Sequence, residues 1–266
     1  MPSPSSSPLS ALTSRDAVVA ALRAAGCVFA EDEAELILAA GAPHEVASMV
    51  GRRTAGLPLE LVVGWARFGG LRITVEPGVF VPRRRTEFLV EQALAQAPSA
   101  AVVVDLCCGS GAVGAALAAG LGEAELHAAD IDPAAVRCAR RNVACRGGRV
   151  HTGDLFEALP GELRGRVDIL AANVPYVPSA EIGLLPPEAR DHEPRVALDG
   201  GADGLDVLRR VASGAPGWLA PGGCLLVEAG RRQASAAVDA FTAAGLRPRL
   251  AVCEERYAHV VIGVRP

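Results

Sequence analysis

The 266-residue sequence contains no lysine, so all 26 of its basic residues are arginines. This absence excludes enzyme mechanisms that depend on a lysine, such as Schiff-base chemistry or nucleotide binding by a P-loop. An excess of positive charge is also lacking, because 30 acidic residues give a formal net charge of −4. Sequence-independent affinity for nucleic acid rests on neutralising many phosphates. The composition therefore disfavours a general polyanion-binding protein and leaves room only for a local basic patch.

The sequence also lacks the patterns of a disulfide framework, a metal site and a membrane protein. Its seven cysteines are an odd number without a CxxC pair, and its five histidines are scattered, so we expect buried thiols in a reducing compartment and no metal. No run approaches the roughly 20 apolar residues that cross a bilayer, and the Pro/Ser-rich N-terminus has no signal-peptide core. We therefore expect a cytoplasmic protein with no membrane association.

What the sequence does contain is a change of pattern near residue 70. Residues 14–68 carry apolar positions at helical spacing between glycine and proline breakers, which predicts a small lobe of short helices. The β-branched stretch that follows predicts a hairpin or linker, and Thr86 is expected to cap a helix over 87–97. The expected domains are an N-terminal tail and helical lobe at 1–70, a hairpin linker at 71–85 and a second domain at 86–266.

Strands and helices alternate in this second domain. The predicted strands are short, continuous apolar runs, which are typical of parallel strands covered on both faces. Strands are expected at 101–106, 125–130, 149–152, 167–172, 223–228, 248–254 and 258–264, and helices at 111–120, 133–145, 204–213 and 232–244. This order predicts an α/β fold with a doubly wound, mostly parallel seven-stranded sheet, closed by an antiparallel pair.

The first strand leads into a glycine-rich turn. Gly109, Gly111 and Gly114 match the dinucleotide-binding fingerprint, and Asp130 stands about 20 residues further on, where an acid binds a ribose. The match alone is weak, since glycines also serve simply to make a tight turn. A dehydrogenase would need a histidine or a tyrosine–lysine pair near the strand ends, and no such pattern is present.

Acidic residues at successive strand ends favour S-adenosylmethionine over NAD as the ligand. Asp130 can take both ribose hydroxyls, and Asp105 near the turn suits a ligand with a cationic amino acid instead of a second phosphate. Asp154 could accept from an adenine amino group, with Leu155 and Phe156 beside the ring, or could simply form an Asx turn. The acids together therefore indicate S-adenosylmethionine.

The fourth strand opens into Asn173-Val174-Pro175-Tyr176. Pro175 favours an extended Val174, whose carbonyl can then join the Asn173 side chain as a second acceptor in one crevice. Two acceptors suit the NH2 of a planar amide or aromatic amine, whose nitrogen must be held in line with an electrophilic methyl group. Tyr176 can cover the flat face of that group. Positioning and electrostatic stabilisation can carry such a step without a general base, although the segment could also be a plain turn.

The motifs VFVPRRRTE, DLCCGSGAV, DIDPAAV, GDLF, NVPY and EPRVALDGGADGL, in this order, resemble those of the protein-(glutamine-N5) methyltransferases that modify peptide-chain release factors. The resemblance covers nearly everything after residue 10. It implies a class I methyltransferase-like fold, S-adenosylmethionine as cofactor, a release factor as protein partner and a helical lobe that helps to recognise it. The implied cofactor contacts are Cys107, Cys108, Gly109, Ser110, Gly111, Asp130, Asp154, Leu155 and Asn173, and the implied catalytic residues are Asn173, Val174, Pro175 and Tyr176.

The sequence departs from the family pattern at three places. Val174 replaces the first proline of NPPY, which keeps the carbonyl and loses some rigidity. Arg84 and Arg85 replace a proline and usually an acid in the family's PRPxTE segment, which alters the cofactor rim or the docking surface. Cys107 and Cys108 enter the first turn, where we expect them to be small packing residues.

Two other functions stay open at this point. The same chemistry could act on an exocyclic amine of DNA or RNA after base flipping, which the net acidity disfavours. The departures at Val174, Arg84 and Arg85 are also compatible with a binding protein that keeps the cofactor pocket and has lost catalysis.

Overall fold

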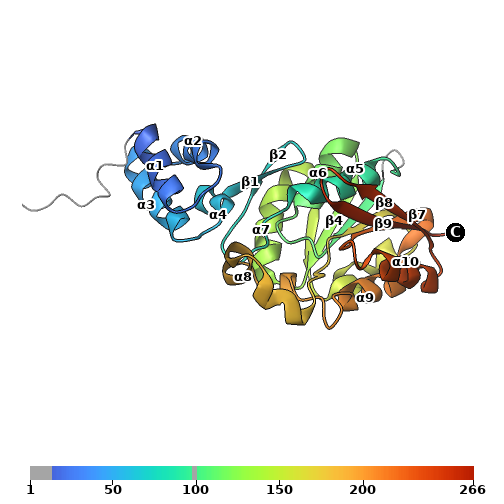
Figure 1. Ribbon diagram of the computed structural model, residues 1–266. Helices are drawn as coiled ribbons and strands as arrows, with labels where there is room; N and C mark the ends of the chain where they lie inside the picture. The colour runs from blue at the N-terminus through green and yellow to red at the C-terminus, as the bar shows by residue number, and fades with distance from the viewer. Residues whose placement is uncertain (1–13, 98–100) are drawn as a thin grey trace, which may run out of the picture. The chain divides into compact units, whose positions relative to one another are not determined.

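The computed structural model describes residues 14–97 and 101–266 (Figure 1). The chain divides into two compact units. The first runs up to Trp65 and includes Pro186–His192, and the second comprises Ala66–Leu185 and Glu193–Pro266. The expected Pro/Ser-rich tail lies outside the described residues. Within the described ranges, no helix is both long and apolar enough to cross a membrane.

The first unit is a bundle of short helices. Apolar side chains at helical spacing, among them Leu22, Ile37 and Val50, form its core. Ser14 precedes the first helix and its hydroxyl oxygen accepts a hydrogen bond from the Ala17 N–H at 3.3 Å. The helices are α1 (Arg15–Ala24), α2 (Ala30–Ala40), α3 (Pro43–Thr54), α4 (Leu59–Val63) and α8 (Pro187–His192).

Arg53 ties α8 to this first unit. Its guanidinium pairs with Glu33 at 2.6 Å and with Glu188 of α8 at 2.7 Å. The side chains of Arg53 and Glu33 are largely buried, so this pair is less screened than an exposed ion pair. The sequence did not reveal that residues 186–192 belong with the helices, because an ion pair between residues 135 positions apart leaves no local pattern.

A short hairpin lies at the start of the second unit, made by β1 (Trp65–Phe68) and β2 (Leu71–Thr74). Gly69 and Gly70 form its two-residue turn with φ of +55° and +74°, the geometry that matches the twist of a tight hairpin. β1 therefore falls where the sequence predicted helix. Its apolar residues fit the spacing of a helix as well as that of a strand, and the Gly69–Gly70 turn favours the strand.

Thr86 precedes α5 (Glu87–Leu94) as predicted, but its role as the N-cap is wrong. A short 3-10 turn over Arg84–Thr86 gives Thr86 helical dihedral angles, whereas a capping residue needs an extended conformation. Its hydroxyl instead donates to Glu228 Oε2 at 2.7 Å.

The second unit is built on a seven-stranded sheet with the order β5-β4-β3-β6-β7-β9-β8. All neighbouring strands are parallel except for the pairs that β9 makes with β7 and β8. This confirms the predicted doubly wound, mostly parallel sheet. The strands are β3 (Val102–Leu106), β4 (Glu125–Asp130), β5 (Arg149–Thr152), β6 (Val167–Ala172), β7 (Leu219–Glu228), β8 (Arg247–Cys253) and β9 (Ala258–Val264).

Helices cover both faces of this sheet. One buried cluster joins α5 and α6 (Ala112–Leu121) to one face, with α7 (Pro133–Val143) packed beside α6 and on β4 and β5. A second cluster joins α9 (Asp206–Gly214) and α10 (Ala234–Ala243) to the other face. Because both faces are buried, the central strands can be apolar throughout. This is why β3, β4 and β6 were predicted to within one residue at each end, whereas β7 begins four residues before its predicted start at residue 223.

The strand order fixes where a ligand can bind. The chain adds β4 and β5 on one side of β3 and then continues with β6 on the other side, so the order of strand addition reverses between the parallel neighbours β3 and β6. In open α/β sheets, ligands bind outside the carboxyl ends of the strands at such a switch point. The residues that follow Leu106 and Ala172 are therefore the first candidates for a functional site.

Candidate active site

The strand register brings the predicted polar residues to one edge of the sheet. Leu106 at the end of β3 pairs with Ala129 of β4 and with Ala172 of β6, and Asp130 of β4 pairs with Thr152 of β5. The strands therefore end side by side. The polar side chains at or just beyond these ends are Asp105, Asp130, Asp154 and Asn173.

The turn after β3 uses left-handed backbone conformations at Cys107, Gly109 and Gly111, with φ of +54°, +53° and +76°. A Cβ added to Gly111 would lie 3.0 Å from the Ala139 Cβ, so glycine is needed for α6 to begin this close to α7. A Cβ added to Gly109 would meet nothing nearer than 4.0 Å. The backbone at Gly109 therefore leaves space for a ligand to approach closely.

The side chain of Asn142 holds this turn in place and links it to the hairpin. Ser110 is buried, and its carbonyl accepts a hydrogen bond from the Asn142 side chain of α7 at 2.8 Å. The same Asn142 side chain contacts both the N–H and the carbonyl of Thr74 at 2.9 Å. The turn is thus braced by α7 and by the hairpin, a support that sequence motifs did not reveal.

Burial keeps the two thiols of the turn protonated. The pKa values of Cys107 and Cys108 are both raised far above the usual thiol value, first by burial and then by neighbouring carboxylates, including Asp105 and Asp130. A thiol needs to ionise before it can act as a nucleophile or redox group. This electrostatic environment agrees with the prediction that these cysteines are packing residues.

Asp105 is buried beneath the turn. Its carboxylate Oδ2 accepts the Gly114 N–H at 2.8 Å, which anchors the first turn of α6 to β3. Burial raises the pKa of Asp105 to about 7, with Asp130 adding to the increase and the Gly114 hydrogen bond opposing it. A cation bound nearby would favour the ionised form.

Asp130 reaches across the edge to the same turn. Its Oδ2 accepts the Gly109 N–H at 2.8 Å and its Oδ1 accepts the Asp132 N–H at 2.9 Å. Burial raises its pKa above the ordinary aspartate value. Each carboxylate oxygen keeps a second lone pair, so Asp130 is able to accept two hydroxyl groups in the position predicted for a ribose.

Asp154 and Leu155 follow β5. The Asp154 carboxylate pairs with Arg210 of α9 at 2.7 Å, and Leu155 has φ of +49°. A leucine in this conformation is strained, and such residues cluster at ligand sites. Phe156, which was expected beside an adenine ring, stacks on Trp218 with ring centroids 5.7 Å apart, so one face of its ring is already covered.

Asn173 presents a buried acceptor at this edge of the sheet. Its Oδ1 atom is buried and, among the described residues, has no hydrogen-bond partner. A buried acceptor left unpaired costs about 1–3 kcal/mol, so buried polar groups are nearly always satisfied. At the switch point of the sheet, this oxygen is placed to accept an N–H group from a bound molecule.

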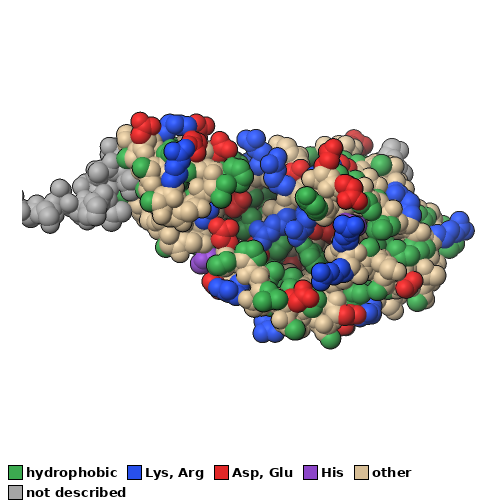
Figure 2. All heavy atoms as spheres, viewed as in Figure 1, with side chains coloured by type: hydrophobic (Ala, Val, Ile, Leu, Met, Phe, Trp, Pro, Cys, Tyr) green, Lys and Arg blue, Asp and Glu red, His purple; other side chains and the backbone are tan. Residues whose placement is uncertain are grey.

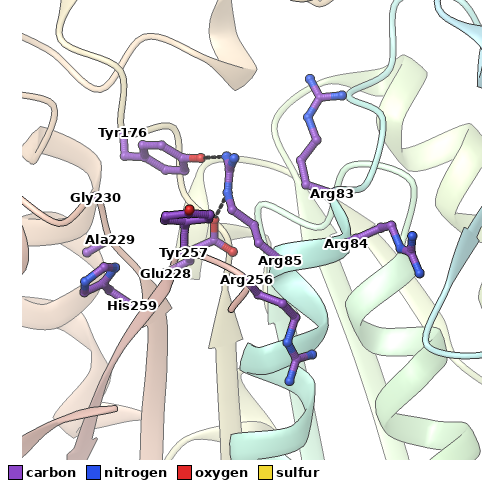
Figure 3. Close-up of a pocket in the computed structure, with 10 residues that line it drawn as sticks. All are labelled: Arg83, Arg84, Arg85, Tyr176, Glu228, Ala229, Gly230, Arg256, Tyr257 and His259. Atoms are coloured by element: carbon purple, nitrogen blue, oxygen red, sulfur yellow. Dashed lines mark hydrogen bonds and ion pairs between the residues drawn. The ribbon is translucent and has the colours of Figure 1, made fainter. Parts of the chain in front are cut away.

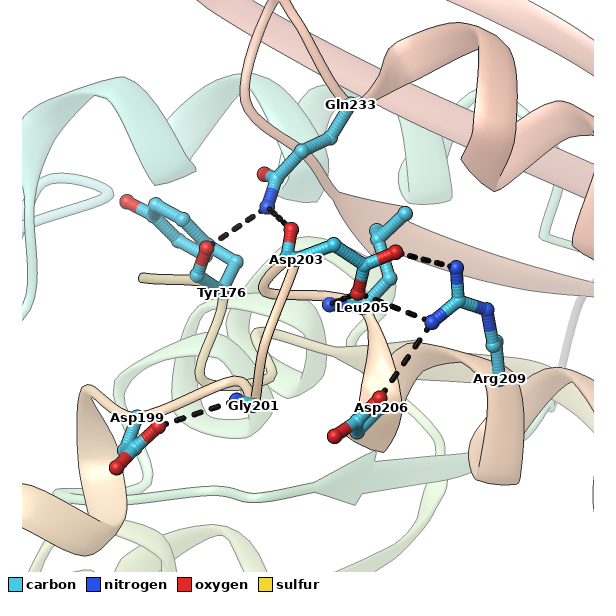
Figure 4. A network of polar contacts seen from close by, with 8 residues as sticks. All are labelled: Tyr176, Asp199, Gly201, Asp203, Leu205, Asp206, Arg209 and Gln233. Carbon is cyan, nitrogen blue, oxygen red and sulfur yellow. Dashed lines mark hydrogen bonds and ion pairs between the residues drawn. The ribbon is translucent and has the colours of Figure 1, made fainter. Parts of the chain in front are cut away.

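The loop over 193–204 supports the segment after Asn173 (Figure 4). A Cβ on Gly200 would lie 2.7 Å from the Pro175 carbonyl oxygen, and one on Gly204 would clash with the carbonyl oxygen of Tyr176. Gln233 of α10 donates through Nε2 to the Tyr176 carbonyl at 2.9 Å. Val174 is fully enclosed. Gly200 and Gly204 therefore pack directly against the backbone of the site.

Tyr176 is fixed at its other end by a polar chain (Figure 3). Arg85 donates through Nη2 to the Tyr176 hydroxyl and through Nε to Glu228 Oε1 at 2.8 Å. Glu228 is 3% exposed and also accepts the Thr86 hydroxyl. Burial raises the pKa of Tyr176, with Glu228 adding to the increase and Arg85 opposing it. Sequence motifs did not indicate this chain of contacts, because Arg85 and Glu228 are 143 residues apart.

The chain is similar to several known methyltransferases. The family description "Methyltransferase small domain" matches residues 70–183. The release factor glutamine methyltransferase of Geobacter sulfurreducens is 42% identical over 76% of this chain and 72% of its own length. That of Mycolicibacterium smegmatis is 39% identical over 86% and 88%. A Streptomyces pristinaespiralis relative named 4-amino-L-phenylalanine/4-methylamino-L-phenylalanine methyltransferase is 38% identical over 84% and 78%.

Solved structures show the same fold at low sequence identity. A methyltransferase from Pyrococcus furiosus superposes with a TM-score of 0.56, at 16% identity over 74% of this chain and 89% of its own. A ribosomal protein L11 methylase from Lactobacillus delbrueckii subsp. bulgaricus gives a TM-score of 0.51, at 16% identity over 69% and 81%. The seven-stranded sheet is thus that of the class I methyltransferases.

Proposed function

Because this chain belongs to the release factor glutamine methyltransferase family, we propose that it transfers a methyl group from S-adenosylmethionine to the side-chain nitrogen of a glutamine in a peptide-chain release factor. The observation that carries the proposal is the buried Asn173 Oδ1 atom, which has no partner among the residues described. It stands at the end of β6, next to the switch point, where an amide N–H of the substrate would satisfy it. Release factors act in translation, so the cytoplasm is the proposed place of action.

The residues at the carboxyl edge fit S-adenosylmethionine, which supplies an electrophilic methyl group when bound. The open backbone at Gly109 and the spare lone pairs of Asp130 suit its amino-acid and ribose portions. The strained Leu155 beside Asp154 suits the adenine end. The buried carboxyl of Asp105 would favour a cation in the turn. The proposed contacts are Cys107, Cys108, Gly109, Ser110, Gly111, Asp130, Asp154, Leu155 and Asn173.

The proposed catalytic segment works by positioning. The Asn173 Oδ1 atom and the Val174 carbonyl accept the two N–H groups of the glutamine amide and aim its nitrogen at the methyl group. Pro175 keeps Val174 extended, and the Tyr176 ring covers the flat amide. The bound cofactor would supply the methyl group as its sulfur–carbon bond breaks with the electron pair staying on sulfur, which leaves S-adenosylhomocysteine. The Asn173 and Val174 acceptors would stabilise the positive charge that develops on the glutamine nitrogen as it bonds to the methyl carbon, and this nitrogen would then lose a proton to solvent.

Mutation of Asn173 tests this proposal. Asn173→Ala removes one of the two acceptors, so methyl transfer to a release factor is expected to slow by about 100-fold or more. Cofactor affinity, measured by calorimetry, should change far less than the rate if the main role of Asn173 is to hold the substrate amide. An unchanged transfer rate would contradict the assignment.

The helical first unit is proposed to contact the protein substrate, in line with the division into a recognition lobe, a hairpin and a methyltransferase domain. Two large apolar side chains support this. Val28 is 84% exposed and Phe29 is 68% exposed, just before α2. Adjacent exposed apolar residues are typical of surfaces that bind another protein.

A second candidate substrate is a free amino acid with an aromatic amine, as in the name of the Streptomyces pristinaespiralis relative. The specific observation in its favour is an arginine-lined cavity beside Tyr176, where Arg84 and Arg85 depart from the family pattern. An arginine can bind the carboxylate of such an amino acid. Incubation with the free arylamine and mass spectrometry of the small-molecule fraction tests this candidate.

Nucleic acid is the less favoured substrate. Among the arginines of α7, Arg141 pairs with Glu76, so one charge of a possible basic patch there is already neutralised. On the face drawn in Figure 2, acidic side chains of the described residues lie among the basic ones, which weakens the attraction for phosphates. Binding of single-stranded RNA or DNA that falls steeply with salt, followed by methylation of a base, would reverse this preference.

A further inference from the structure

A cavity of about 450 Å³ opens beside the proposed acceptor site (Figure 3). Tyr176 belongs to its lining, and so does Glu228 at the end of β7. Because Ala172 of β6 pairs with Val227 of β7, Asn173 and Glu228 follow at the ends of neighbouring strands. Neighbouring strands lie about 4.8 Å apart. A substrate whose nitrogen is held at Asn173 can therefore extend into this cavity.

Four arginines line the cavity, and three of them have acidic partners. Arg83 binds both carboxylate oxygens of Glu193 at 2.6 Å, and Arg85 binds Glu228 at 2.8 Å. Arg256 makes a two-bonded pair with Glu91, with distances of 2.8 and 2.6 Å. These pairs hold the arginines in fixed positions around the cavity and neutralise most of their charge.

Arg84 is the fourth arginine, and it differs from the others. Its guanidinium has no hydrogen bond or ion pair with any residue in the ranges 14–97 and 101–266. Four arginines against the three carboxylates of Glu91, Glu193 and Glu228 leave a surplus of one positive charge at the cavity. Arg84 supplies that charge from an exposed position.

Tyr257 adds a second recognition group to the rim of the cavity. Its side chain is 83% exposed, although tyrosine is usually at least partly packed, and its φ is +50°. The left-handed conformation belongs to the turn between β8 and β9, where the Tyr257 N–H donates to the Glu254 carbonyl at 3.1 Å, and this turn holds the ring out into solvent at the rim. Tyrosine and arginine are also the residue types enriched where proteins bind partners.

We propose that this cavity binds a carboxylate carried by the substrate, close to the nitrogen that is methylated, with Arg84 as the binding cation and Tyr257 packing against the group that bears it. Guanidinium and carboxylate match in a planar, two-bonded geometry. A doubly charged phosphate fits less well, because the cavity has a surplus of only one positive charge. The inference rests on the proposed methyl transfer, since it places the carboxylate relative to Asn173.

Synthetic glutamine peptides test the carboxylate site. Aspartate is placed in turn at each of the three positions before and after the glutamine, and each peptide is compared with its asparagine counterpart. Binding to the full chain with S-adenosylhomocysteine is measured by calorimetry, and methyl transfer is measured separately. At one position or more, aspartate is expected to improve Kd by about 10-fold over asparagine. The free arylamine amino acid and its carboxamide form the second arm.

The variants Arg84→Ala and Tyr257→Ala should abolish or weaken this preference, whereas Arg137→Ala, an exposed arginine on α7, should retain it. A carboxylate preference in the peptide arm identifies an acidic residue of a protein substrate, and one in the amino-acid arm identifies a free amino acid. Equal affinity for acid and amide in both arms, or a preference that survives Arg84→Ala, overturns the proposal. If an aspartate peptide binds in a way that depends on Arg84 but its glutamine is not methylated, the carboxylate site is supported and the proposed reaction is rejected.

Discussion

Asp105 shows how one buried residue links stability to pH. Its pKa is raised to about 7, so between about pH 4 and 7 the folded protein holds a proton that the unfolded chain has lost. The contribution of Asp105 to the free energy of unfolding therefore falls as pH rises from about 4 to 7, and it is constant above that range. Asp105→Asn keeps an acceptor for the Gly114 N–H and removes the buried charge.

We compare the free energy of unfolding of Asp105→Asn with that of the natural protein. The difference, variant minus natural protein, is expected to increase by more than about 1 kcal/mol between pH 5 and pH 8. Urea unfolding at both pH values measures the difference. An equal effect of the substitution at the two pH values would show that the carboxyl of Asp105 is ionised throughout.

Arg85 is a positioning residue for Tyr176, to which it is hydrogen-bonded. Arg85→Met leaves the tyrosine hydroxyl unanchored and the buried Glu228 without its cation. We expect kcat to fall by about 10-fold with cofactor affinity unchanged. The pKa of Tyr176 should also rise further, because Arg85 opposes the effects of burial and Glu228.

Ultraviolet titration can resolve this change, because the chain contains only two tyrosines. Tyr257→Phe in the background of both proteins isolates the Tyr176 signal. Arg137→Met is the matched control and should leave both kcat and the titration as they were. A lower kcat with no movement of the tyrosine titration would assign Arg85 a purely structural role.

At the scale of elements, the loop over 193–204 packs closely against the segment that follows β6. Gly200→Ala would push a methyl group to 2.7 Å from the Pro175 carbonyl, so one of the two backbones has to move. We expect a loss of about 1–3 kcal/mol in stability and a fall in kcat of about 10-fold or more. Cofactor affinity should be nearly unchanged.

Gly161→Ala is the control for this substitution. Gly161 has an ordinary backbone conformation, and a Cβ there meets nothing within 4 Å. Enzyme assays and thermal unfolding compare the two variants. If Gly200→Ala kept full activity, the position of Pro175 and Tyr176 would not matter for the reaction.

The elements also show how far the sequence alone could go. β6 and its neighbours were predicted because their apolar runs are continuous and their ends are marked by polar residues. β1 was missed because its four residues fit a helical pattern until the Gly69–Gly70 turn is considered. β7 begins at Leu219, four residues before the predicted start at residue 223, because Pro221 and two glycines disguise its first part.

Contacts between distant residues were beyond sequence reasoning. Asn173 was found because it follows a strand in a recognisable motif. Arg85 and Glu228 were not paired in advance, and neither were Gln233 and the Tyr176 carbonyl, because only the folded sheet brings them together. The sequence showed that Arg84 and Arg85 depart from the family pattern. Their different roles follow from the folded structure, in which Arg85 pairs with Glu228 and Arg84 stays exposed.

For the whole molecule, the two units are proposed to have different roles: the first contacts the protein substrate and the second carries the active site. If the first unit contacts the protein substrate through Val28 and Phe29, Phe29→Asp should raise KM for an intact release factor by about 10-fold. It should leave KM for a short glutamine peptide unchanged, because a peptide bound at Tyr176 does not require the first unit. Steady-state kinetics with both substrates measures the contrast. Equal effects on both substrates, or on neither, would contradict this role.

The most direct test of the central proposal is mass spectrometry of a purified release factor after incubation with S-adenosylmethionine and either the natural protein or its Asn173→Ala variant. With the natural protein, one glutamine of the release factor is expected to gain a single methyl group on its side-chain nitrogen. With Asn173→Ala, the rate of that gain should fall by about 100-fold or more. No methylated glutamine with the natural protein, or equal rates with the two proteins, would contradict the proposal.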